Sequence, residues 1–402
     1  MSRAGHEVVV YDTTPDVGGA WSATRRYPGV TTQSPKDTYT FSDFPMPAEY
    51  PEWPEGAQVQ AYVEAYVENF GLQPLLRLNT EVRRATPIDG GWDLQVRDLV
   101  GGSTRHEIVE HLVVANGVFS QSVMPRYAGA EEFTAAGGQL IAANEFHDTS
   151  TAVGAHAVVV GYGKSSCDVA LEISRVAAET HVIARQLLWK VPRRLHGVLN
   201  FKYLLLTRLG EGLFGWEHLR GVEKFLHGPA DGLRRRMLNS VGDISVKMYD
   251  LEGLGLVPRG SMEHIIRSAI GLVTDGFFEQ VTAGRIEVHR DTVITRLSAV
   301  DGVPHAELAD ASLVRADLLV CATGYTQSLP FFDDEVADAL TDERGNFALY
   351  RQSLPVSVPN LSFTGYNSSF FSPLNAEIGA IWVAATLTGL VRLPARGDAR
   401  TH

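Results

Sequence analysis

The chain has 402 residues, 45% of them hydrophobic and 20% charged, which is typical of a globular protein with sizeable cores and suggests about two domains. Its formal net charge of −12 argues against binding to nucleic acids or to anionic membrane surfaces. The two cysteines, Cys167 and Cys321, form no CxxC pair, so the sequence argues against a disulfide scaffold, a zinc site and a dithiol redox enzyme, and we expect no bound metal.

No segment predicts a leader or a membrane span. The most apolar stretch, residues 198–216, is interrupted by Lys202, Arg208 and Glu211, which favours a partly buried helix near a domain interface over membrane docking. The first residues lack the charged region and long apolar run of a signal peptide. We therefore expect a cytoplasmic protein without a transmembrane segment.

The first predicted element is a buried strand, VVVY, that ends at Asp12. In dinucleotide-binding folds an acid at the end of the second strand holds a ribose. In such folds a first strand, a glycine-rich loop and a helix precede that strand, whereas only a few residues lie ahead of it here. The sequence therefore predicts a ribose-binding acid whose phosphate loop is missing from this chain.

Glycines and aromatic residues dominate the next segment. Gly18 and Gly19 would let the backbone approach a flat ligand with Trp21 beside it, although a tight turn with a core tryptophan explains these residues equally well. The prolines and aromatic residues that follow predict an irregular but packed cover. Apolar residues at helical spacing then predict a helix over residues 57–71, and strand-like runs predict a meander that ends in VVANG, residues 113–117.

A complete β–α–β unit is predicted from residue 156 to residue 185, with the turn GYGKSS between its first strand and its helix. Gly161 allows a tight turn, and Gly163 lets a pyrophosphate approach the backbone at the helix N-terminus. Ser166 replaces the third glycine, and its hydroxyl can donate to a phosphate. A plain strand-to-helix turn is the alternative, but the full context favours dinucleotide binding.

The second strand of this unit ends in Arg185, where NAD-binding proteins usually carry an acid. An arginine there suits the 2′-phosphate of NADPH, through bidentate hydrogen bonds and charge. Lys190, Arg193 and Arg194 follow closely, and an ordinary solvated basic cluster is the alternative. The sequence favours NADPH over NADH.

Two strand-to-glycine turns, VVANG and CATGY, bracket the β–α–β unit and the mostly helical region, residues 202–276, that follows it. Such a pair is typical of a chain that leaves one domain and later returns to it. After the second turn, a short strand, a loop and an apolar helix close the chain. The sequence therefore predicts an α/β fold with one domain inserted into another.

In order along nearly the whole chain, VVVYDTTPDVGGAW, FSDFP, GYGKSS, the arginine after THVIA, CATGY and GYNSSFFSPLNAEIGA resemble the flavin-containing monooxygenase family. The combination is more specific than any single motif. The resemblance implies two Rossmann-like dinucleotide-binding domains, with an NADPH domain inserted into a discontinuous FAD domain. It further implies an enzyme that reduces FAD with NADPH, forms a flavin hydroperoxide with oxygen, and transfers one oxygen atom to a nitrogen or sulfur centre of a small organic substrate.

The resemblance also places domains and cofactor-binding residues on this chain. The FAD-binding domain would comprise residues 1–150 and 312–402, and the NADPH-binding domain would comprise residues 151–311 with a helical insertion. Asp12 would hold the FAD ribose, where the family has Glu, and Gly18, Gly19 and Trp21 would lie along the flavin. The remaining cofactor-binding residues are Asn116, Gly117, Thr323 and Gly324 at the bracketing turns, Gly161, Gly163, Lys164, Ser165 and Ser166 at the NADPH pyrophosphate, and Arg185 at its 2′-phosphate.

Two stretches depart from the family pattern. Gln33 stands where the family has an asparagine near the reactive edge of the flavin, and we expect its amide to take the catalytic role. The family's motif FxGxxxHxxxY corresponds to AGGQLIAANEF, in which Gly138 is kept but Ala142 and Phe146 replace the histidine and the tyrosine. The Baeyer–Villiger version, which ends in tryptophan, fits no better, so the substrate is left open.

The larger departure is the missing first strand with its GxGxxG loop. Losing several charge-assisted hydrogen bonds, each contributing about 1.5–3 kcal/mol, would weaken FAD binding by orders of magnitude and would expose unpaired strand edges. We therefore expect that Met1 is not the native start and that this chain alone holds FAD poorly.

Other functions are kept beside the leading one. Relatives of the family insert oxygen next to a ketone (Baeyer–Villiger) or hydroxylate amines, and a pyridine-nucleotide disulfide reductase shares the two-domain plan but requires a CxxC pair. A truncated remnant that binds NADPH without turnover is the non-enzymatic alternative. The expected partners are a small-molecule substrate and molecular oxygen, and the oligomeric state stays open.

Overall fold

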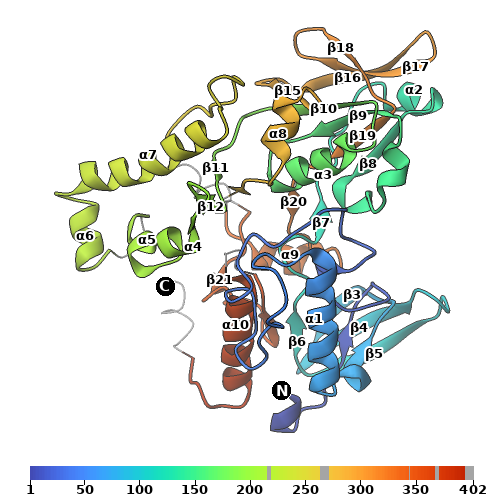
Figure 1. Cartoon of the computed structure of the whole chain (residues 1–402). Coiled ribbons are helices and arrows are strands. Elements are labelled where there is room, and N and C mark those ends of the chain that lie inside the picture. Colours follow the sequence, from blue (N-terminus) through green and yellow to red (C-terminus); the bar gives the residue numbers. More distant parts are fainter. Residues whose placement is uncertain (215–218, 263–270, 344, 367–370, 394–402) are drawn as a thin grey trace. The chain divides into compact units, whose positions relative to one another are not determined.

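The computed structural model describes residues 1–214, 219–262, 271–343, 345–366 and 371–393, apart from the side chains of Arg3, Leu209 and Glu211 (Figure 1). The chain forms two compact units. Unit 1 comprises Met1–Arg26, Ser34–Ser122 and the described part of Tyr325–His402, and unit 2 comprises Tyr27–Gln33 and Val123–Gly324. None of the helices in these described residues is long and apolar enough to cross a membrane.

Unit 2 is built on a parallel sheet of five strands in the order β15-β10-β9-β19-β8 (Figure 1). Because β9 lies between β10 and β19, the direction in which successive strands are added reverses at β9, and the crevice at such a point is where open α/β sheets bind ligands. The predicted β–α–β unit is confirmed. The elements are β8 (Gln139–Ala142), β9 (His156–Val160), α3 (Lys164–Ser174), β10 (Glu179–Ala184), β15 (Glu287–Arg290) and β19 (Leu318–Cys321).

Helices α3 and α8 cover one face of this sheet, and a small antiparallel sheet together with α2 covers the other. Because side chains alternate along a strand, Val159 and Val182 pack on the helical side, whereas Val158 and Ile183 pack on the side of the antiparallel sheet. The covering elements are α2 (Ala130–Ala135), α8 (Phe277–Thr282), β16 (Ile294–Val300), β17 (Val303–Leu308) and β18 (Leu313–Arg315).

The predicted helical region after residue 202 is present, but most of its helices are short. Among the described residues of this region, α7 has 18 residues, and three other helices have four or five residues each. The elements are β11 (Lys190–Val191), β12 (Arg194–Leu195), β13 (Leu199–Asn200), α4 (Lys202–Leu205), α5 (Arg208–Gly212), α6 (Val222–Leu226), α7 (Asp231–Met248) and β14 (Gly271–Leu272).

Unit 1 contains the predicted helix and an antiparallel meander, β3-β4-β5. The strand at VVANG, predicted as the buried end of this meander, instead pairs in parallel with β23, and Val113 is 40% exposed. Its parallel strands form two separate two-stranded sheets, β1-β2 and β23-β6. The elements are β1 (Val10–Tyr11), α1 (Gly56–Asn69), β2 (Leu76–Arg77), β3 (Thr80–Ile88), β4 (Gly91–Asp98), β5 (Thr104–Val109), β6 (Leu112–Val114), β7 (Gln121–Ser122), β20 (Tyr325–Thr326), α9 (Asp334–Leu340), β21 (Leu349–Tyr350), β22 (Leu354–Pro355), β23 (Leu361–Phe363) and α10 (Ser372–Leu387).

The first strand differs from the prediction of a buried strand. Only Val10–Tyr11 form β1, and the side chains of Val9 and Val10 are 38% and 44% exposed. The reason is that β1 pairs with β2 in a sheet of two strands, which leaves the valines without the neighbours that would bury them.

The compact units also differ from the predicted boundaries at residues 150 and 312. Residues 123–150 and 312–324 belong to unit 2, because β8 and β19 pair with each other and β19 pairs with β9. The chain enters unit 2 after Ser122 and leaves it after Gly324, which lie close to the two bracketing turns. The short segment Tyr27–Gln33 joins unit 2 as well, which the sequence did not indicate.

Candidate functional site

The turn between β9 and α3 has the sequence GYGKSS. Its two glycines, Gly161 and Gly163, differ in their backbone conformation and in the space around them. Gly161 has a φ of +119°, and a Cβ there would lie 2.6 Å from the carbonyl oxygen of Ala322 and from Oγ of Ser166. Gly163 has a φ of −76°, and no atom lies within 4 Å of its Cβ position. Backbone and packing therefore require glycine at Gly161, whereas Gly163 leaves open space in front of α3.

The N-terminus of α3 fits the pyrophosphate of a dinucleotide. The helix has 11 residues, and no described side chain caps the amides of its first turn. Free amides and the helix dipole together attract a phosphate. The open space at Gly163 lets such a group approach the backbone closely.

The three residues after Gly163 are more deeply embedded than predicted. Ser166 is fully buried, and its hydroxyl donates to the carbonyl oxygen of Ala322 at 3.3 Å, so the predicted bond from this hydroxyl to a phosphate is corrected. The side chain of Lys164 is 8% exposed and forms an ion pair with Asp168 one turn along the helix. The hydroxyl of Ser165 is 3.0 Å from that of Tyr27.

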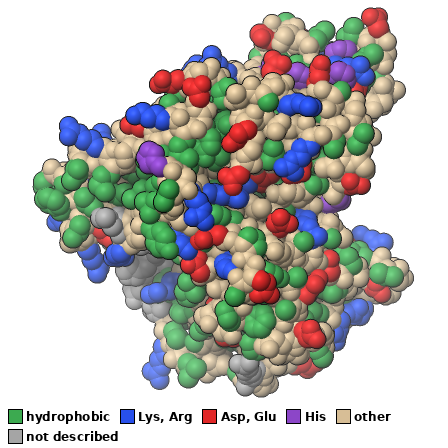
Figure 2. Space-filling model, in the orientation of Figure 1, with side chains coloured by type: hydrophobic (Ala, Val, Ile, Leu, Met, Phe, Trp, Pro, Cys, Tyr) green, Lys and Arg blue, Asp and Glu red, His purple; other side chains and the backbone are tan. Residues whose placement is uncertain are grey.

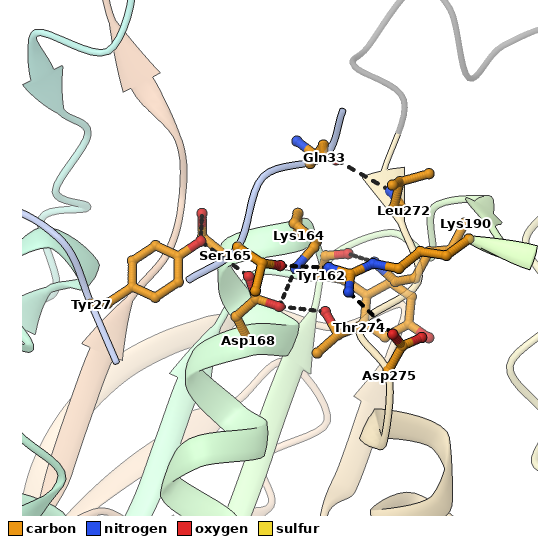
Figure 3. Close-up of polar contacts among 12 residues, drawn as sticks. Tyr27, Gln33, Tyr162, Lys164, Ser165, Asp168, Lys190, Leu272, Thr274 and Asp275 are labelled. Atoms are coloured by element: carbon orange, nitrogen blue, oxygen red, sulfur yellow. Dashed lines mark hydrogen bonds and ion pairs between the residues drawn. The ribbon is translucent and has the colours of Figure 1, made fainter. Parts of the chain in front are cut away.

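Asp168 is the centre of a buried polar network that the sequence analysis missed (Figure 3). Its carboxylate pairs with Lys164 and accepts hydrogen bonds from the hydroxyls of Thr274, at 2.6 Å, and Tyr27, at 3.2 Å. Burial lowers the pKa of Lys164, and the charge of Asp168 acts in the opposite direction. The i,i+4 spacing of lysine and aspartate is readable in the sequence, but nothing local points to the other two partners.

Arg185 directly follows β10 and is exposed, as a residue that meets the 2′-phosphate of NADPH should be. Two of the basic residues that follow it closely in the sequence make contacts of their own. Lys190 is 4% exposed and donates to the carbonyl oxygen of Tyr162 at 2.7 Å, with its ammonium 4.5 Å from the centre of that ring (Figure 3). Arg193 pairs with Asp275 at 3.1 Å. The alternative of an ordinary solvated basic cluster therefore does not hold for Lys190, which is buried.

Gln33 lies in the Tyr27–Gln33 segment of unit 2. Its side-chain oxygen accepts a hydrogen bond from the backbone N–H of Leu272 in β14, at 3.2 Å (Figure 3). This contact fixes the orientation of the amide. Its catalytic role beside a flavin stays a prediction.

Asp12 stands at the end of β1, as predicted. One oxygen of its carboxylate accepts from the backbone N–H of Thr14 at 2.9 Å and from the hydroxyl of the same residue at 2.7 Å. The side chain is partly exposed. The carboxylate is thus held in place by a turn and can still accept from a ribose hydroxyl.

The glycines after Asp12 form a tight turn, and the nearby tryptophan packs in a small aromatic cluster. Gly18 and Gly19 have φ values of +124° and +58°. The ring N–H of Trp21 donates to the hydroxyl of Tyr39 at 3.0 Å, and the two rings meet edge to face at 5.7 Å. The plain structural explanation therefore accounts for all three residues, and their contact with a flavin stays a prediction.

The residues at the bracketing turns serve mainly to tie strands together. Asn116 donates to the carbonyl oxygen of Ser328 at 3.0 Å and accepts from the hydroxyl of Tyr366. In unit 2, the hydroxyl of Thr323 donates to the carbonyl oxygen of Val123. The glycine of each turn has a positive φ, +76° at Gly117 and +97° at Gly324.

The stretch AGGQLIAANEF is part of the core of unit 2. A Cβ at Gly138 would lie 2.4 Å from the ring of Phe133, and Ala142 and Phe146 are each 1% exposed. Its departures from the family motif therefore change packing around β8. The four residues 367–370 of the stretch GYNSSFFSPLNAEIGA lie outside the described residues.

Residues 3–400 match the family described as flavin-binding monooxygenase-like. The N-oxide-forming dimethylaniline monooxygenase 2 of Rattus norvegicus is 24% identical over 416 residues, covering 97% of this chain and 70% of that protein. The closed crystal structure of cyclohexanone monooxygenase aligns with a TM-score of 0.70 at 16% identity, covering 98% of this chain and 81% of that chain. The S-allyl-L-cysteine S-oxygenase from Allium sativum aligns with a TM-score of 0.61 at 16% identity, covering 99% of this chain and 75% of that chain. The structural likeness confirms the predicted fold class.

Proposed function

Because this chain belongs to the flavin-binding monooxygenase-like family, we propose that it transfers one oxygen atom from molecular oxygen to a nitrogen or sulfur centre of a small organic substrate. Family membership makes the protein a flavin-dependent monooxygenase with FAD and NADPH as cofactors. The class of substrate and the type of oxygenation are the proposed part.

The observation that carries the proposal is the contrast between Gly161 and Gly163. The first is demanded by the turn, whereas the second leaves space free at the N-terminus of α3, where a pyrophosphate could approach the backbone. The backbone amides of the first turn of α3 would hold the NADPH pyrophosphate. Arg185, which is exposed directly after β10, would pair with the 2′-phosphate. In unit 1, Asp12 would accept from a ribose hydroxyl of FAD.

The bound flavin supplies the redox and oxygen chemistry, so the protein needs no nucleophile and no acid–base pair of its own. The chain's residues bind and orient the cofactors and keep water from the reaction. The network around Asp168 holds the first turn of α3 in place by contacts from two other segments, which keeps the phosphate-binding amides in a fixed direction.

A substrate panel tests the proposal. The purified chain, supplied with FAD and NADPH, is offered dimethylaniline, S-allyl-cysteine and cyclohexanone under isotopically labelled oxygen, and products are identified by mass spectrometry. We expect label in an N-oxide or a sulfoxide, together with NADPH consumption and a flavin absorption band near about 450 nm.

Two outcomes would favour the alternatives. Labelled lactone from cyclohexanone, without product from the amine or the thioether, would assign a Baeyer–Villiger reaction. A protein that binds NADPH but neither takes up FAD nor forms any oxygenated product would be a nucleotide-binding remnant.

A further inference from the structure

Two histidines and a glutamate meet on the outer strands of the parallel sheet of unit 2. His181 of β10 lies opposite Glu287 of β15, and His289 follows two residues along β15. Since alternate residues of a strand share a face, the three side chains project from the same face of the sheet. Figure 2 shows histidine and acidic side chains gathered where β10 and β15 lie in Figure 1.

The nearest polar atoms of these side chains form a compact triangle. Nδ1 of His181 is 3.1 Å from Nε2 of His289 and 3.5 Å from Oε2 of Glu287, and Nε2 of His289 is 3.7 Å from Oε1 of Glu287. In a tetrahedral zinc site, bonds of about 2.0–2.1 Å separate neighbouring ligand atoms by about 3.3–3.4 Å. The two carboxylate distances involve different oxygens of Glu287, and one ligand atom from each residue lies within 4.8 Å of the others. A small movement of the exposed Glu287 side chain would bring a single oxygen to the spacing that one small cation requires.

A second carboxylate supports the arrangement from behind. Nε2 of His181, the nitrogen that faces away from the triangle, lies 3.5 Å from Oε2 of Glu179, and the same oxygen is 3.1 Å from Nδ1 of His156. A carboxylate on the far nitrogen is the usual partner of a metal-binding histidine, because it fixes the tautomer and the direction of the ring.

The exposure of the side chains also suits a site that an ion can enter from solution. The side chains of His181 and His289 are 13% and 21% exposed, so their neighbours hold the rings in place. The side chain of Glu287 is 66% exposed and can adjust to a ligand, and the solvent side is open for water as the fourth ligand.

We propose that His181, Glu287 and His289 bind a divalent transition-metal cation, with Zn²⁺ the best match to two imidazoles and a carboxylate. The cluster lies near the start of β10 and β15, whereas the GYGKSS turn follows the end of β9. The metal would thus join the edge strand β15 to β10 and stabilise unit 2. The sequence predicted no metal site, because more than a hundred residues separate His181 from the other two ligands.

The test is a zinc titration of the tag-free full chain, freed of metal by a chelator and then dialysed, in competition with a chromophoric zinc indicator. We expect one equivalent to bind, and His181→Ala or His289→Ala to weaken affinity by at least about tenfold. Glu179→Gln should weaken binding by about tenfold with unchanged stoichiometry, since it removes only the supporting carboxylate. Zinc should raise the melting midpoint of the wild type but not of the histidine variants.

His106→Ala is the matched control, because His106 also lies against a carboxylate, that of Asp93 at 3.0 Å, but belongs to unit 1. Circular dichroism checks that each variant is folded, and His289→Gln replaces His289→Ala if the latter does not fold. Zinc affinity that is equal in the wild type, the control and both histidine variants would overturn the site and leave a hydrogen-bonded histidine pair. No cofactor or substrate enters this titration, so its outcome is independent of the proposed oxygenation.

Discussion

At the scale of single residues, neighbouring positions of one motif have separate physical reasons. At Gly161, the positive φ and the nearby carbonyl oxygen of Ala322 exclude a side chain. At Gly163, no atom of the chain lies close enough to exclude one. Ser166, between helix and strand, serves packing. A motif match therefore combines residues needed for folding with residues needed for a ligand, and substitution can separate them.

Gly161→Ala should lower the stability of unit 2 by about 2 kcal/mol or more, because the new methyl group meets the backbone oxygen of Ala322 at 2.6 Å. Gly163→Ala should leave the melting midpoint nearly unchanged but weaken NADPH binding by about tenfold or more, because the methyl group occupies the space of the pyrophosphate. Thermal melting by circular dichroism and a fluorescence titration with NADPH measure the two effects. Normal NADPH binding by Gly163→Ala would remove the pyrophosphate from this turn.

Arg185→Ala should raise the KM for NADPH by about 10–100-fold, since a charge-assisted pair with the 2′-phosphate is worth about 1.5–3 kcal/mol. The KM for NADH should change by less than about twofold, because NADH lacks that phosphate. Steady-state kinetics with both nucleotides give the comparison. Arg175→Ala is the control, as this exposed arginine pairs with Glu172 at the far end of α3; equal effects on both nucleotides would contradict the role of Arg185.

At the scale of elements, polar groups buried between neighbouring strands set how stability depends on pH. His111 directly precedes β6, and its Nε2 is 2.9 Å from the hydroxyl of Ser362 in β23. Burial lowers the pKa of His111 to about 4, whereas an unfolded histidine titrates near 6.5. The folded chain therefore keeps this ring neutral at pH values where the unfolded chain already takes up a proton.

Stability should consequently fall as the pH drops from about 6.5 to about 4, because the unfolded state alone gains the proton in that range. His111→Gln removes the titrating ring and should lose less stability over the same interval. Melting midpoints at several pH values, compared with those of His106→Gln at the exposed position on β5, isolate the contribution. Parallel pH curves for wild type and His111→Gln would show that His111 is not the group responsible.

At the scale of the whole molecule, the segment Tyr27–Gln33 is built into unit 2, whereas the residues that flank it in the sequence belong to unit 1. Tyr27 is 9% exposed and contacts Ser165 and Asp168, and Gln33 binds the backbone of β14. The segment thus holds the first turn of α3 from one side. Tyr27 therefore supports the turn for which we propose pyrophosphate binding.

Tyr27→Phe should lower the stability of unit 2 by about 1–2 kcal/mol, since the change removes a hydroxyl that contacts two buried partners. NADPH binding should weaken a few-fold, because the first turn of α3 loses one of its contacts. Thermal melting and NADPH titration measure both effects, with Tyr203→Phe, at a tyrosine that is 66% exposed, as the control. An unchanged melting midpoint would show that the segment contributes little to unit 2.

The predictions that succeeded depend on short stretches of chain. The strand, turn, helix and strand from His156 to Ala184 are determined by alternation, helical spacing and glycine conformations that all lie within one contiguous segment. The antiparallel strands β3, β4 and β5 of unit 1 are of the same kind. Local propensity and periodicity act over a few residues, so they are readable without the fold.

Partners and burial required the tertiary structure. A solvated cluster was the alternative explanation for Lys190 and its basic neighbours, but Lys190 is buried against Tyr162. The boundary of unit 2 follows from the pairing of β8 with β19. The histidines of β10 and β15 meet for the same reason, through strand order. The sequence by itself determined which segments form the strand, the GYGKSS turn and the helix of unit 2, and which family the chain resembles. Only the tertiary structure decided which side chains are accessible to a ligand and which are buried in the core, because burial depends on contacts between segments that are far apart in the chain.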